Sequence, residues 1–117
     1  MIVRASDAEP VQMLEGVTRR TLAAGERVMI VEFRFREGAT LPSHSHPHEQ
    51  AGYLVAGRIR LEIDGRAFEL GPGDSYRVPS GAQHRVDVLD EAVAIDAFAP
   101  PREDYASQHS QIQARER

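Results

Sequence analysis

Apolar and polar side chains alternate along most of this chain from about residue 28 onward. In the segment 28–36 one face of an extended strand would carry Met29, Val31, Phe33 and Phe35, and the other face would carry charged side chains. The segment 58–63 repeats this alternation with Ile59, Leu61 and Ile63. Because successive side chains of a strand point to opposite faces, the period of two predicts strands with one buried face.

Glycine, proline and aspartate divide this pattern into short strands. Asp64-Gly65 predicts a two-residue hairpin turn between the segments 58–63 and 66–70, and Gly71-Pro72-Gly73-Asp74 predicts a second turn. Further strands are expected at 75–78, 84–89, 93–99 and 18–23, whereas 9–16 suggests a helical turn. Many short strands joined by such turns indicate an all-β antiparallel sandwich or barrel.

The chain has 117 residues, which is the length of one domain. We expect the domain to span residues 1–106 and to be followed by a polar tail, 107–117, in which His109 is solvated. The formal net charge is -4 and the arginines are scattered, so no basic patch indicates a nucleic-acid partner. No segment has the apolar length of a membrane-spanning helix or of a signal peptide. The absence of cysteine excludes disulfides and thiolate zinc sites and is compatible with the cytoplasm, where we expect the protein.

Four of the five histidines lie in two short segments, His44-Ser45-His46-Pro47-His48 and, further on, His84. Neutral imidazole is the commonest protein ligand for divalent transition metals. A His-x-His step places two imidazoles on one face of an extended strand. The sequence therefore predicts a metal site. His48, which follows Pro47, is expected at the surface or, alternatively, beside the site, where it orients a ligand or the substrate.

The glycines around these histidines give the two segments the form of the two sequence motifs of the cupin superfamily. Gly38 precedes His44 by six residues and Gly57 follows Gln50 by seven, while the second segment contains Gly73, Pro79, Gly81 and His84. The chain resembles that superfamily over residues 38–84. The resemblance implies a single-domain cupin, which is an all-β jelly-roll barrel or double-stranded β-helix.

Two positions depart from the motifs: Gln50 stands where most cupins have a metal-binding glutamate, and Val88 stands in place of the final asparagine. Glu49 is an alternative fourth ligand, but the spacing to Gly57 favours Gln50, and a shift by one residue turns a strand side chain to the opposite face. The resemblance thus implies one divalent ion, of zinc, nickel, manganese, iron or cobalt, held by four side chains. These are His44, His46, Gln50 and His84.

All four implied ligands are neutral, so the ion would keep its full double positive charge. Such a site is a stronger Lewis acid, and attracts an anionic substrate better, than a site with a glutamate ligand. Four protein ligands also leave coordination positions open for substrate or water.

A second cluster of polar residues lies near the end of the chain, where Asp96 and Phe98 share a strand face and Arg102 follows Pro100-Pro101. Composition alone favours a core phenylalanine, an aspartate paired with an arginine and a solvated Arg102. The segments 72–76 and 98–105, together with Gln50, resemble the pectin-degradation cupins, which linearise unsaturated uronates. That resemblance implies that Asp96, Phe98 and Arg102 line an active site beside the metal.

The implied function is a metal-dependent sugar-acid isomerase that converts 4,5-unsaturated galacturonate into linear 5-keto-4-deoxyuronate. Asp96 would move protons, Arg102 would bind the substrate carboxylate, and Phe98 would pack on the sugar ring. The alternatives are another cupin enzyme, such as a dioxygenase or a polyketide cyclase, and a non-catalytic sugar-sensing module. Besides the uronate substrate, we expect a second copy of the chain as partner in a homodimer, because exposed strand edges favour pairing.

Overall fold

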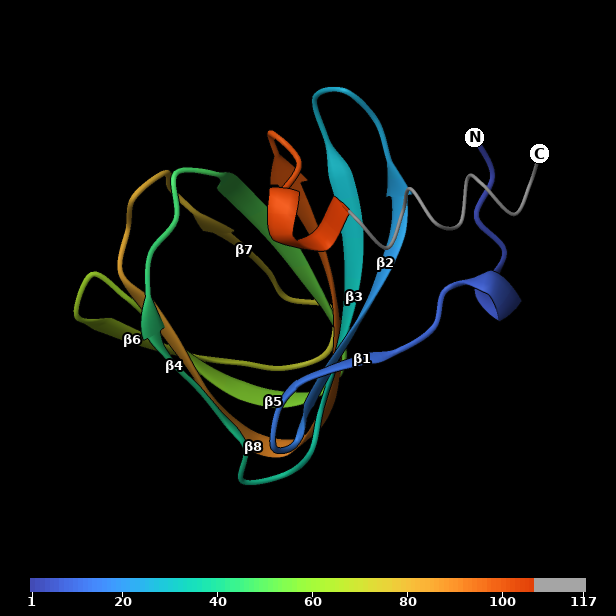
Figure 1. Ribbon diagram of the computed structural model, residues 1–117. Helices are drawn as coiled ribbons and strands as arrows, with labels where there is room; N and C mark the ends of the chain where they lie inside the picture. Colours follow the sequence, from blue (N-terminus) through green and yellow to red (C-terminus); the bar gives the residue numbers. More distant parts are fainter. Residues whose placement is uncertain (107–117) are drawn as a thin grey trace.

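The computed structural model describes residues 1–106, so the predictions for the tail 107–117 and for His109 lie outside the described residues. Eight strands form one antiparallel sheet that curls into a barrel (Figure 1). The strands are β1 (Val11–Leu14), β2 (Val17–Ala24), β3 (Met29–Phe35), β4 (Thr40–His44), β5 (Glu49–Ile63), β6 (Arg66–Leu70), β7 (Ser75–Val78) and β8 (His84–Ala99). The predicted all-β barrel is confirmed. None of the helices within residues 1–106 is long and apolar enough to cross a bilayer.

The long strands β5 and β8 lie at the centre of the sheet. Along its first half β8 pairs with β4, along its second half it pairs with β3, and it pairs with β5 in both halves. The segments 84–89 and 93–99, which the sequence predicts as two strands, are therefore one strand that runs down one side of the barrel and up another (Figure 1). The segment 58–63 likewise continues backwards to residue 49.

Gly57 makes the bend of these two strands possible. Its φ is +86°, and a Cβ atom added to it would lie 2.1 Å from the carbonyl oxygen of Glu91 and 2.6 Å from the Cα of Ala92. The register between β5 and β8 shifts at this point, which is typical of a β-bulge. A side chain at residue 57 would force the two strands apart, so only glycine fits here.

The local predictions hold where turns and alternation are strong and fail at the N-terminus. Asp64 and Gly65 have φ values of 47° and 81°, as a two-residue hairpin of the predicted kind requires. The helical turn predicted for 9–16 is wrong: residues 11–14 form β1, which pairs antiparallel with β2, and the nearby helical turn is a 3-10 turn, η1 (Ala5–Asp7). Pairing with a sheet edge thus overrides the weak local preference.

The inward faces of the strands form an apolar core, which includes the predicted set of Met29, Val31, Phe33 and Phe35. Polar side chains are also buried, on these faces and in the connection between β4 and β5, and several of them lie near one end of the barrel. They are His46, Gln50, His84 and Asp96. Because buried polar groups need partners, their grouping at this end of the barrel indicates a functional site there.

Candidate metal centre

A cavity of about 310 Å³ lies inside the barrel. Its inner part is lined by core side chains such as Phe35, Ile59 and Leu61. Its polar lining consists of Ser43, His44, Gln50, Tyr76, His84, Asp96, Arg102 and Tyr105. Three of the four predicted metal ligands and all three predicted catalytic residues, Phe98 included, thus line one cavity.

Three imidazoles lie together beside this cavity. The ligand atoms of His44, His46 and His84 are all within 4.8 Å of one another. His44 is the last residue of β4 and pairs with His84, the first residue of β8. His46 lies beyond the end of β4, in the connection to β5, so the predicted strand face supplies His44 and a loop supplies His46. Within residues 1–106 this trio can hold one metal ion.

Each of these imidazoles is held in the orientation that a metal ligand needs. The Nδ1 atoms of His44, His46 and His84 lie 2.8, 3.0 and 2.9 Å from backbone carbonyl oxygens two residues away. Because a carbonyl oxygen only accepts hydrogen bonds, each Nδ1 carries the proton. Each Nε2 is then left with a lone pair, which is the form that binds a metal.

Gln50 completes the group in the way that the sequence predicts. Its amide N–H donates to Asp96 Oδ2, and because a carboxylate only accepts, this contact turns the amide oxygen toward His46. The Gln50 Oε1 lies 3.1 Å from the Nε2 of His46, so two lone-pair atoms face each other. Ligand atoms about 2.1 Å from one ion and at right angles to each other are separated by about 3 Å, so this distance fits two ligands of one cation.

Glu49, the alternative ligand, points away from the cavity. Its side chain is 52% exposed, and its Oε2 accepts a hydrogen bond of 2.7 Å from Arg77 Nε. The one-residue difference between Glu49 and Gln50 therefore separates the outer from the inner face of β5, as the alternation of strand side chains requires.

Two of the imidazoles, those of His46 and His84, are neutral at neutral pH. Burial lowers the pKa of His84 from 6.5 to about 4, and burial together with the nearby Arg102 lowers the pKa of His46. Because a metal ion binds the unprotonated imidazole, no proton has to be displaced from these two side chains at neutral pH.

Asp96 is a buried carboxylate with two hydrogen-bond donors. Asp96 is only 2% exposed. Its carboxylate accepts one hydrogen bond from the Gln50 amide and one of 2.6 Å from the Tyr76 hydroxyl. Its partners among residues 1–106 are thus an amide and a phenol, rather than the arginine that composition favours. Burial raises its pKa to about 6, against the opposing effect of both hydrogen bonds.

Tyr76 is a site residue that the sequence analysis missed. It alternates with the buried Val78 in the segment 75–78, and this signal places its side chain on the inner face. The pattern gives no indication that the inner face of β7 lies next to Asp96, because that depends on how three strands pair.

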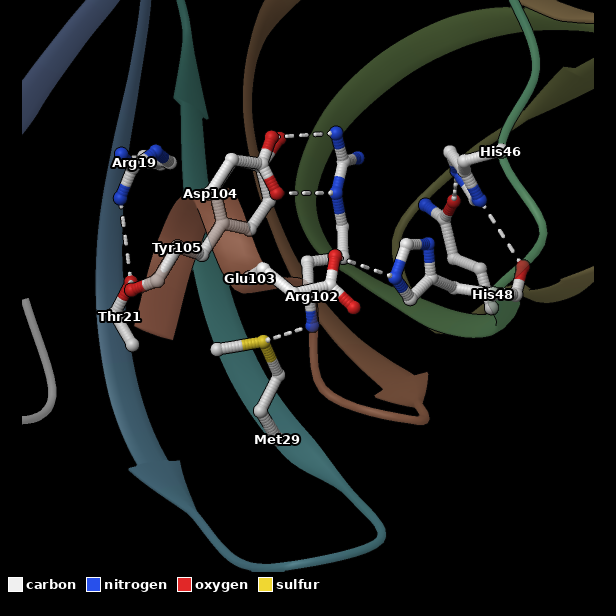
Figure 2. Close-up of polar contacts among 10 residues, drawn as sticks. Arg19, Thr21, Met29, His46, His48, Arg102, Glu103, Asp104 and Tyr105 are labelled. Atoms are coloured by element: carbon white, nitrogen blue, oxygen red, sulfur yellow. Dashed lines mark hydrogen bonds and ion pairs between the residues drawn. The ribbon is translucent and has the colours of Figure 1, made fainter. Parts of the chain in front are cut away.

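Arg102 lies at the cavity between two aromatic rings. Its guanidinium carbon is 5.3 Å from the centre of the Phe98 ring and 4.2 Å from that of Tyr105. Asp104 accepts hydrogen bonds from its Nε and Nη2, which leaves Nη1 and the second N–H of Nη2 for a ligand (Figure 2). Only 15% of the side chain is exposed, so Arg102 is not the solvated residue that composition suggests.

The turn that carries Arg102, residues 102–106, is fastened to the barrel at several points (Figure 2). The Arg102 N–H donates to Met29 Sδ over 3.1 Å, and the Thr21 hydroxyl donates to the Tyr105 carbonyl oxygen over 3.2 Å. Glu103 lies 3.5 Å from the Nε2 of His48. These contacts hold the turn beside the cavity.

His48 is buried beneath this turn, and the prediction that it lies at the surface is wrong. The residue is 6% exposed, with Glu103 on its imidazole. Its support for the metal centre comes from the main chain, because its carbonyl oxygen accepts the Nδ1 proton of His46. The alternative, a position beside the site, agrees with the structure.

Comparison with known proteins identifies the family. Residues 31–98 match the family model of the cupin domain. The chain is 33% identical over 93 residues to the pectin degradation protein KdgF of Dickeya dadantii, a match that covers 78% of this chain and 84% of the relative. It is 34% identical over 80 residues to the oxalate decarboxylase OxdC of Bacillus subtilis, but it covers only 21% of that longer protein.

Solved structures give the same result. The structure of KdgF from a Halomonas species superposes with a TM-score of 0.83 at 29% identity and covers 89% of this chain and 96% of that one. An RmlC-like cupin from Shewanella frigidimarina gives a TM-score of 0.84 at 31% identity, over 89% of this chain and 94% of that one. The chain is therefore a member of the cupin family and, within it, a pectin-degradation cupin.

Proposed function

We propose that this protein is a metal-dependent isomerase that opens the ring of 4,5-unsaturated galacturonate to give linear 5-keto-4-deoxyuronate. One observation carries the proposal: a buried carboxylate, Asp96, is joined through Gln50 to His46, one of three clustered imidazoles, and Asp96, Gln50, His44 and His84 line one cavity with Arg102. The similarity to KdgF, a pectin degradation protein, supports a uronate as substrate. The similarity to the oxalate decarboxylase OxdC supports the broader statement that the protein is an enzyme.

The donor set fits one divalent ion of zinc, nickel, manganese, iron or cobalt, held by His44, His46, Gln50 and His84. When bound, the ion would supply a Lewis acid that stabilises negative charge on a substrate oxygen. The remaining chemistry belongs to the side chains around it.

Arg102 is placed to orient the substrate. Its Nη1 end can donate to the sugar carboxylate, and a guanidinium fits a carboxylate with parallel hydrogen bonds. The ring of Phe98 is held edge-on against His46, with centres 5.8 Å apart, and offers an apolar surface beside the same position. Together the two side chains would fix the sugar ring relative to Asp96.

Asp96 would move the proton in this reaction. The carboxylate would accept the proton of the anomeric hydroxyl, the bond between carbon 1 and the ring oxygen would break, and an aldehyde and an enolate would form. Transfer of this proton from Asp96 to carbon 4 would convert the enolate into the 5-keto product, so the reaction is an isomerisation without net gain or loss of atoms. A pKa of about 6 suits a group that must both accept and release a proton near neutral pH.

The test is an ultraviolet assay of the conjugated alkene of unsaturated galacturonate, with metal-loaded protein and with protein treated with chelator. We expect rapid loss of absorbance with the loaded protein and a return to the spontaneous rate after chelation or in Asp96→Asn. Asp87→Asn is the matched control, because Asp87 lies on β8 but faces outward to Arg85 and Thr40. Loss at only the spontaneous rate with loaded protein would refute the proposal, and oxygen consumption would indicate a dioxygenase.

A further inference from the structure

Three residues on three neighbouring strands form one row across the inner face of the sheet. Gly52 on β5 pairs with Asp96 on β8 and with Tyr76 on β7. Side chains in such a row point to the same face, so Gly52 stands between the carboxylate and the phenol. In Figure 1 β5 and β7 are seen side by side on this wall of the barrel.

Gly52 leaves the space that the Tyr76 ring occupies. A Cβ atom at residue 52 would lie 2.2 Å from Cε2 and Cζ of Tyr76 and 2.4 Å from its hydroxyl oxygen. The φ of Gly52 is not in the left-handed region, so the backbone conformation does not require glycine. Glycine inside a strand costs conformational entropy and provides no side chain for packing. At residue 52 the close approach of the Tyr76 ring explains why glycine is present.

The ring crosses Gly52 to reach the carboxylate. Tyr76 donates to Asp96 Oδ1 over 2.6 Å, and Gln50 donates to Oδ2, so each carboxylate oxygen has one donor. The torsion that orients a carboxylate plane is soft, and it is therefore set by hydrogen-bond partners. Without the Tyr76 hydroxyl, Asp96 would keep a donor on only one side and could rotate away from the substrate.

We propose that Tyr76 is a positioning residue that holds the plane of the Asp96 carboxylate for proton transfer, and that Gly52 is present to admit its ring. The role of Tyr76 in the reaction rests on the proposed function, whereas its contact with Asp96 does not. In this proposal Tyr76 acts through its hydrogen bond to Asp96.

Tyr76→Phe tests the proposal, because it keeps the ring and removes only the hydroxyl. Loss of a hydrogen bond to a charged group predicts a decrease in kcat of about 10- to 100-fold. We expect the KM to stay within about twofold, since substrate contacts are unchanged. Tyr53→Phe is the matched control, because Tyr53 is the neighbouring residue on β5 and is 51% exposed.

A second measurement does not depend on activity. With ¹³Cγ-labelled aspartate, the resonance lost in Asp96→Asn identifies the Asp96 carboxyl carbon. This resonance should shift in Tyr76→Phe and stay in place in Tyr53→Phe. An unmoved resonance would overturn the proposed contact, and a shifted resonance with unchanged kcat would overturn the positioning role. If the wild-type protein does not consume the uronate, the proposed function fails, and the resonance still decides whether Tyr76 holds Asp96.

Discussion

The substitution Asp96→Asn is expected to abolish proton transfer and at the same time to stabilise the protein at neutral pH. Asp96 is 2% exposed, and burial raises its pKa from 3.8 to about 6. The folded protein therefore holds this proton up to about pH 6, whereas the unfolded chain releases it near pH 4. Above pH 6 the folded state must keep an ionised carboxylate in a site that favours the neutral form.

The magnitude follows from the two pKa values. A difference of about 2 pH units corresponds to about 3 kcal/mol of stability, which is lost as the pH rises from about 4 to above 6. An asparagine has the same shape, can accept from Gln50 and donate to Tyr76, and does not ionise. The stability of Asp96→Asn relative to the wild type should therefore increase by up to about 3 kcal/mol between pH 4 and pH 8.

The assay is urea unfolding of the metal-free protein, followed by circular dichroism at five or more pH values between about 4 and 8. Asp87→Asn is the control without a pH dependence in this range, because Arg85 and Thr40 lower the pKa of the outward-facing Asp87 below its unfolded value of 3.8. The stability that Asp87 contributes is present above its unfolded pKa, so the difference between Asp87→Asn and the wild type should stay constant from about pH 4 to pH 8. Stability curves of wild type and Asp96→Asn that stay parallel across this range would refute the reasoning.

Further predictions concern the metal ligands and Arg102, the proposed binder of the substrate carboxylate. Glu49→Gln should leave the metal content, measured by mass spectrometry, unchanged, because Glu49 points away from the cavity. Gln50→Glu should retain the metal but lower kcat about tenfold or more, because a second carboxylate beside Asp96 raises the pKa of Asp96 further. Arg102→Lys should raise the KM for the uronate about tenfold with little change in kcat, since an ammonium cannot form two parallel hydrogen bonds to a carboxylate. An unchanged KM would exclude binding of the substrate carboxylate by Arg102. The metal-free protein should lose the stability contributed by neutral His84 as the pH falls from about 6.5 to about 4, and His84→Gln should remove that part of the acid dependence in urea unfolding.

The part of the fold that the sequence predicts is the part encoded locally. Alternation places Glu49 and Gln50 on opposite faces of the strand, and the spacing to Gly57 in the cupin motif favours Gln50 as the inward one, as observed. The hairpin at Asp64-Gly65 follows from backbone angles that few residue pairs adopt. Such signals require no knowledge of what lies across the barrel.

The missed features depend on neighbours that are remote in the sequence. His48 is buried because the turn 102–106 lies over it, more than fifty residues later. Tyr76 meets Asp96 because β5 pairs with both β7 and β8, and no local pattern specifies that arrangement. The homodimer, the cytoplasmic location and the catalytic roles stay predictions.

The bend of β8 divides this strand into two arms, so the angle at the bend sets the distance between the residues at the ends of the arms. His84 starts one arm of this strand and Asp96 lies near the end of the other, while the corner beside Gly57 lies between them. At about 3.3 Å per residue, His84 lies about 25 Å and Asp96 about 13 Å from the corner at Ala92, so a change of about 5° in the corner angle displaces Asp96 by about 1 Å relative to the other arm. Displacements of about 1 Å in an active site can cost two orders of magnitude in rate. Substitutions around the corner, far from the substrate, therefore offer a way to adjust the distance between the metal ligands and the proton-transferring group without altering either.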